Sequence, residues 1–85
     1  MPKTVLITGA TSGFGSAAVH RFAAAGWKVI ATGRRAERLQ TLAAELPTGQ
    51  LHTAAFDMRD GHALSAAIDA LPAAFADIDV LVNNA

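Results

Sequence analysis

The stretch Thr8-Gly9-Ala10-Thr11-Ser12-Gly13-Phe14-Gly15 decides the fold of this chain. It continues a short apolar and β-branched run, Val5–Thr8, and leads into Gly13–Gly26, where apolar residues recur with helical spacing. In such a strand–turn–helix unit the first glycine permits a tight turn, the second lets backbone approach an anion, and the third lets the helix lie close to the strand. Free N–H groups at the helix N-terminus attract negative charge, so the turn predicts a phosphate cradle.

The same alternation of strand and helix patterns continues along the chain. Further strands are expected at Trp27–Thr32, Leu51–Phe56 and Asp79–Val82. Two more helices are expected between them, one ending before Pro47 and one beginning at an N-cap, Asp60. The order β-α-β-α-β-α-β with short connections predicts an α/β fold, a Rossmann-like doubly wound parallel sheet of which this is a four-strand N-terminal portion.

Composition excludes several classes of protein. The 85 residues are 52% hydrophobic and 16% charged with no net charge, which excludes an intrinsically disordered chain and predicts neither nucleic acid nor membrane as partner. No cysteine is present, so there is no disulfide framework, and the histidines lie apart, so no metal site is expected. No targeting segment is visible, so the expected location is cytoplasmic.

The motifs resemble those of the short-chain dehydrogenase/reductase family. The spacing Gly-x-x-x-Gly-x-Gly after Thr8 differs from the general dinucleotide fingerprint and is similar to that family's. The segment Asp79–Ala85, ending in Asn-Asn-Ala, and Asp57 after the third strand also fall where the family has its own motifs, so the resemblance covers the whole chain. Phe14 departs from the pattern, since a smaller aliphatic residue is more usual there.

The resemblance implies a set of cofactor-binding residues at the carboxyl ends of the strands. The carboxylate of Asp57 would accept from the adenine amino group, although it also suits a turn cap, and the backbone of Met58 would donate to the ring. Asn84 would lie beneath the cofactor ribose, or form a plain turn with Asn83, which can instead brace a strand. The full set is Gly9, Ala10, Thr11, Ser12, Gly13, Phe14, Arg34, Arg35, Asp57, Met58 and Asn84.

The end of the second strand predicts which nucleotide binds. A domain that uses NAD places Asp or Glu there to accept hydrogen bonds from the ribose 2′-hydroxyl. This chain has Gly33-Arg34-Arg35, with no acid before Glu37. Guanidinium groups pair with a 2′-phosphate, so NADP is the expected cofactor. The alternative is that both arginines are solvated charges, but they would oppose the positive N-terminus of the helix they open.

The family's chemistry is hydride transfer between a nicotinamide and a carbonyl or alcohol, and by resemblance it uses a tyrosine, a lysine four residues later and a serine. The chain has no tyrosine, and Lys3 and Lys28 lie at the amino ends of strands. No catalytic residue is therefore assigned.

Residues 1–85 are expected to be the NADP(H)-binding portion of a homo-oligomeric enzyme, truncated before its catalytic half and inactive alone. Gly33–Leu39 and Leu71–Phe75 are similar to bacterial NADP-dependent 3-hydroxy acid dehydrogenases, which implies a small carbonyl or alcohol substrate. The alternatives are a non-catalytic NADP-binding sensor module and an inactive fragment.

Overall fold

The computed structural model describes residues 2–84 as one sheet flanked by helices. Ala85, the last residue of the Asn-Asn-Ala motif, lies outside the described residues. The elements follow the predicted order, with a short 3₁₀ turn, η1, added before the last strand. They are β1 (Thr4–Ile7), α1 (Gly13–Ala24), β2 (Lys28–Gly33), α2 (Ala36–Ala44), β3 (Leu51–Ala55), α3 (Gly61–Asp69), η1 (Ala73–Phe75) and β4 (Val80–Val82).

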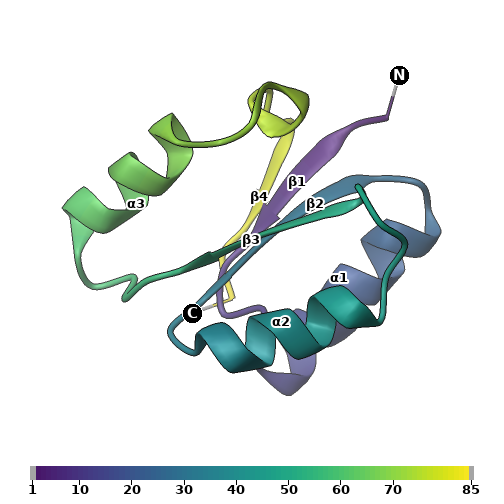
Figure 1. The fold of residues 1–85 in the computed structure, drawn as a ribbon, viewed down its shortest axis with the longest axis horizontal. Helices are drawn as coiled ribbons and strands as arrows, with labels where there is room; N and C mark the ends of the chain where they lie inside the picture. The colour runs from purple at the N-terminus through teal and green to yellow at the C-terminus, as the bar shows by residue number, and fades with distance from the viewer. Residues whose placement is uncertain (1, 85) are drawn as a thin grey trace.

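The strands lie in the order β3-β2-β1-β4, and every neighbouring pair is parallel. Helices α1 and α2 cover one face of the sheet and α3 covers the other, as Figure 1 shows. The predicted α/β doubly wound fold is confirmed. Because all strands run the same way, their carboxyl ends lie along one edge, where open α/β sheets bind ligands.

Trp27 was expected to begin the second strand, and this boundary is wrong by one residue. Its N–H donates to Phe22 O at 3.0 Å, so it closes the C-terminal turn of α1. Gly26 supplies the left-handed conformation that such a helix end favours, with φ of 88°. The Trp27 ring then packs edge-on against Phe22, with ring centroids 4.9 Å apart, and β2 begins at Lys28.

Alternating side chains of the central strands enter two cores. Val5 and Ile7 of β1 face the helices α1 and α2, while Leu6 between them faces η1 on the other side. The same alternation in β2 puts Ile30 beside Leu6. Both faces of β1 are fully buried, as expected for a central strand of a parallel sheet, which fixes the strand register.

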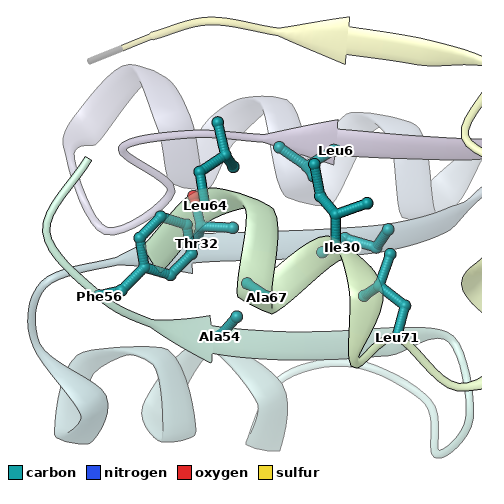
Figure 2. A pocket seen from close by; sticks show the side chains of 9 residues that line it. Leu6, Ile30, Thr32, Ala54, Phe56, Leu64, Ala67 and Leu71 are labelled. Atoms are coloured by element: carbon teal, nitrogen blue, oxygen red, sulfur yellow. The ribbon is translucent and has the colours of Figure 1, made fainter. Parts of the chain in front are cut away.

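Helix α3 packs on the opposite face, and its side chains are less buried than those of α1 and α2. In Figure 2, Leu64 lies beside Thr32 and toward Phe56, while Leu71, which follows α3, lies near Ile30. The space between them is apolar and has no room for a water molecule, so it is packing and not a ligand site.

Strand β4 forms one edge of the sheet in this chain, and it is apolar. Leu81 is 62% exposed and Val80 is 38% exposed. Asp79 ties the start of the strand to β1, because its carboxylate accepts from Thr4 N at 2.9 Å and its own N–H donates to Thr4 O at 2.8 Å. Among residues 2–84, none of the helices has the length and apolar character needed to cross a bilayer.

Candidate cofactor-binding site

The turn after β1 has the backbone geometry that its glycines predict. Gly9 has φ of 61°, a conformation that L side chains rarely adopt. A Cβ on Gly15 would lie 2.0 Å from Gly9 O, so only glycine allows α1 to approach the turn this closely. Ser12 is the N-cap of α1, and its Oγ accepts from Gly15 N at 3.1 Å. The expected close packing of helix on strand is confirmed.

The first turn of α1 presents unused hydrogen-bond donors to solvent. Within residues 2–84, the N–H groups of Gly13 and Phe14 find no acceptor, as the first donors of a helix do when no ligand is bound. A Cβ on Gly13 would meet nothing within 4 Å, so the space above this residue is open. Free donors, a positive helix end and open space together fit a phosphate group.

Asn84 connects the end of β4 to this turn. Its side-chain amide donates to Ser12 Oγ at 2.8 Å and to Gly9 O at 3.2 Å. The Ser12 hydroxyl in turn donates to Gly9 O at 2.9 Å. The amide of Asn84 is therefore a brace for the glycine-rich turn as well as a lining residue of the cleft described below.

Thr8 joins the carboxyl ends of β1 and β4, a role that sequence reasoning missed. The buried Thr8 hydroxyl accepts from Asn84 N at 2.9 Å and lies 3.1 Å from Asn83 Oδ1, to which it donates. Asn83 thus braces the neighbouring strand, as one of the two sequence interpretations expected. The sequence could have indicated this role for Thr8, because a hydroxyl side chain at the end of a buried apolar strand needs a polar partner.

Two arginines follow β2 directly and are exposed. Arg35 occupies the N-cap position of α2 and its side chain makes no capping hydrogen bond. Ser, Thr, Asp or Asn at this position typically stabilises a helix by about 1 kcal/mol relative to a residue that cannot cap. Helix α2 lacks that stabilisation, and the two arginines place positive charge at its positive end. Both features indicate that Arg34 and Arg35 serve a role other than stabilising the fold.

Asp57 lies after β3 and is bound by Arg59 rather than free. Its Oδ2 accepts from Arg59 Nη2 at 2.8 Å and its Oδ1 accepts from Arg59 N at 2.9 Å. These hydrogen bonds lower the pKa of Asp57 to about 2, and the charge of Arg34 adds to the effect. Helix α3 is capped by a different residue, Asp60, whose carboxylate accepts from His62 N and Ala63 N. The prediction of Asp60 as N-cap is confirmed.

An open cleft of about 580 Å³ brings most of these residues together. Such a volume lies in the range of small-molecule and cofactor sites. Its lining comes from the glycine-rich turn, the end of β2, the start of α2, the loop after β3 and the end of β4. The lining residues are Gly9, Thr11, Ser12, Gly33, Arg34, Arg35, Arg38, Phe56, Asp57, Met58, Arg59 and Asn84.

Three of the predicted residues, Ala10, Gly13 and Phe14, do not line the cleft. The methyl group of Ala10 is buried in the core and its N–H donates to Thr32 O at 2.9 Å, so the side chain is not available to a ligand. Gly13 and Phe14 begin α1, and the Phe14 ring is 85% exposed. Their contact with a cofactor stays a prediction that rests on their backbone donors.

Four lining residues were missed by sequence reasoning. Gly33 ends β2, and Phe56 separates the cleft from the apolar packing under α3, since it lines both. Arg38 follows Arg35 by three positions, a helical spacing that puts both on one side of α2. Arg59 follows Asp57 by two. The last two spacings were readable signals. Among residues 2–84, no three His, Cys, Asp or Glu side chains gather as a metal site would require.

Comparison with known proteins identifies the class of this chain. The sequence profile of the short chain dehydrogenase family matches residues 3–85. The chain therefore belongs to the short chain dehydrogenase family.

Particular relatives are similar over the same stretch. Serine 3-dehydrogenase of Agrobacterium fabrum is 63% identical over 100% of this chain, and NADP-dependent 3-hydroxy acid dehydrogenase YdfG of Salmonella typhi is 56% identical over 95% of it. These alignments cover 34% and 32% of the two relatives, so the chain spans about a third of the length of the curated relatives it matches.

The fold agrees with a solved structure that contains a nucleotide. The closed form of serine dehydrogenase complexed with NADP+ superposes with a TM-score of 0.91 and 51% sequence identity. The match covers 95% of this chain and 32% of that one. Both the sequence and the fold of this chain are therefore similar to the corresponding third of an NADP+-binding protein.

Proposed function

We propose that this chain is the NADP(H)-binding portion of an NADP-dependent oxidoreductase. The observation that carries the proposal is the pair Arg34 and Arg35, which lines the cleft at the end of β2 where an NAD-binding domain has an acid. Two similar proteins support it, since one is named as NADP-dependent and the other is complexed with NADP+.

The residues that would hold the cofactor fall into three groups. The free N–H groups of Gly13 and Phe14 at the start of α1 would bind the pyrophosphate. Arg34 and Arg35 would pair with the 2′-phosphate. Other lining residues would surround the adenosine and the ribose by resemblance to the family, namely Gly9, Thr11, Ser12, Asp57, Met58 and Asn84.

The proposed reaction is hydride transfer between the nicotinamide and a carbonyl or alcohol. The bound cofactor supplies or accepts the hydride, and the described residues bind and orient it. A 3-hydroxy acid is the proposed substrate class, because the relatives include a serine 3-dehydrogenase and a 3-hydroxy acid dehydrogenase. We place the proton-transferring and substrate-binding groups in a portion of the protein outside these 85 residues.

The proposal is tested on the full-length protein in two steps. Equilibrium dissociation constants for NADPH and NADH come first, and NADPH is expected to bind at least tenfold more tightly, as about 1.4 kcal/mol from charged hydrogen bonds to a phosphate would give. NADPH oxidation with small 3-oxo acids and aldehyde acids comes second. Tighter binding of NADH would contradict the cofactor assignment, and NADPH binding without any turnover would favour a non-catalytic NADP-binding module.

A further inference from the structure

The cleft carries mainly positive charge, and one acidic side chain interrupts it. Arg34, Arg35 and Arg38 line it at the end of β2 and the start of α2. Among residues 2–84, Asp57 is the one carboxylate in the lining, and it comes from the loop after β3. A free carboxylate in a phosphate-binding site would weaken binding in two ways: it repels the phosphate, and it attracts the arginines that would otherwise bind the phosphate.

Arg59 donates hydrogen bonds to both carboxylate oxygens of Asp57. Its Nε lies 3.2 Å from Oδ1 and its Nη2 lies 2.8 Å from Oδ2, while its backbone N–H donates to Oδ1 at 2.9 Å. An isolated pair with a side chain as exposed as Arg59, at 82%, contributes little to stability. The two-pronged geometry and the backbone anchor nevertheless fix which guanidinium the carboxylate holds.

Arg34 is a second arginine whose charge acts on the same carboxylate. It lines the same cleft, and its charge already contributes to the lowered pKa of Asp57. Yet within residues 2–84, Arg34 makes neither an ion pair nor a hydrogen bond. The carboxylate is bound by an arginine of its own loop, and Arg34, which follows β2, stays unpaired.

We propose that Arg59 is a positioning residue that binds Asp57 and thereby leaves Arg34 free for the 2′-phosphate, which sets the preference for NADP(H) over NAD(H). The inference rests on the proposed function, since it assumes that a 2′-phosphate binds in this cleft. It assigns Arg59 no contact with the cofactor: the residue acts through Asp57 and Arg34.

The ratio of the NADPH and NADH dissociation constants is the readout, measured on the full-length protein. Arg59→Met releases the carboxylate to Arg34, and NADPH affinity is expected to fall about three- to tenfold while NADH affinity changes little. Arg59→Lys retains a charge for Asp57 and should keep most of the preference. Arg21→Met is the matched control, because Arg21 is exposed on α1 and does not line the cleft.

Repeating the Arg59 substitution in a protein that also carries Asp57→Asn separates the proposed role of Arg59 from two alternatives. In Asp57→Asn the competing charge is gone, so adding Arg59→Met should leave the NADPH:NADH ratio unchanged. Equal losses of both cofactors in Arg59→Met would mean that Arg59 only orients Asp57, and would overturn the proposal. An equal fall of the ratio in both backgrounds would mean that Arg59 meets the phosphate itself, and would also overturn it.

The wild type distinguishes failure of this inference from failure of the proposed function. If the wild type does not prefer NADPH, the cofactor assignment fails and the inference fails with it. If the wild type prefers NADPH and the ratio survives Arg59→Met, the inference alone is wrong. Circular dichroism of each variant checks that the fold is retained, which is expected because Arg59 is on the surface.

Discussion

The side-chain amide of Asn84 donates to the hydroxyl of Ser12 at 2.8 Å, across 72 positions of sequence. Ser12 is also the N-cap of α1, so one serine side chain links the helix, the glycine-rich turn and the end of β4. These hydrogen bonds hold the turn in place before any ligand binds. Such preorganisation lowers the free-energy cost of ordering the turn when a phosphate binds its backbone donors.

Replacing Asn84 by alanine should loosen this turn. The loss of two hydrogen bonds at a partly buried site is expected to lower the free energy of unfolding by about 1–2 kcal/mol. NADPH and NADH should both bind more weakly, and by a similar factor to each other, because the turn binds the pyrophosphate that the two nucleotides share. Urea unfolding and dissociation constants measure the two effects. Asn84→Asp is the matched control, since it keeps the size without an N–H donor and should not restore either property.

Two glycines of the turn should separate folding from binding. Gly15→Ala puts a Cβ 2.0 Å from Gly9 O and should destabilise the fold by about 3 kcal/mol or more. Gly13→Val puts its Cβ in open space, so the thermal midpoint should change little while both nucleotides are lost. Binding that survived Gly13→Val would contradict the phosphate cradle.

Much of this fold was predictable because local pattern and tertiary position agree. The run Val5–Thr8 is apolar without alternation, and β1 is buried on both faces. Boundaries moved by a residue where hydrogen bonding decides them, as at Trp27, whose N–H completes the turn after α1. The exposed edge of β4 shows the same apolar pattern as a buried strand, so its exposure was not readable from its own residues.

The candidate site likewise has a part that could be predicted from the sequence and a part that could not. Glycines carry their geometry in their chemistry, so the tight turn at Gly9 and the close approach at Gly15 were predictable. The role of Ser12 as N-cap and of Thr8 as the link to β4 was not predicted.

Partnerships between side chains were not predicted either. Asp57 was expected to be free for an adenine ring, but which of several arginines a carboxylate holds depends on rotamers and loop conformation. Arg38 and Arg59 were missed although their spacings were readable, since Arg38 follows Arg35 by three positions and Arg59 follows Asp57 by two.

Replacing Arg34 and Arg35 together by alanine should weaken NADPH binding by about 1–3 kcal/mol, or about 10- to 100-fold. NADH affinity should be nearly unchanged, because NADH has no 2′-phosphate for these side chains to pair with. Isothermal titration with each nucleotide measures the difference, and its salt dependence should fall as charges are removed. Arg21→Ala controls for the loss of surface charge outside the cleft. Equal losses for both nucleotides would contradict the 2′-phosphate assignment.

The Asp57–Arg59 pair predicts a dependence of stability on acid pH. The pKa of Asp57 is about 2 in the folded chain, below its ordinary value of 3.8, because Arg59 donates hydrogen bonds to the ionised carboxylate. A lowered pKa stabilises the fold fully above the ordinary value and less as pH falls from there towards 2. The pair's contribution should therefore disappear between about pH 4 and pH 2.

Carboxyl ¹³C titration of aspartate-labelled full-length protein tests this directly, with the Asp57 signal assigned from its absence in Asp57→Asn. The wild-type signal should titrate near pH 2, and in Arg59→Met it should move up towards 3.8, since the main hydrogen-bond donor is gone. Urea midpoints of the two proteins should differ only slightly at neutral pH, because so exposed a pair contributes little to stability, and should converge at the acid end of this window. A wild-type Asp57 that titrates at its ordinary value would show that the pair does not persist in solution, and the competition between Arg59 and Arg34 would then have no basis.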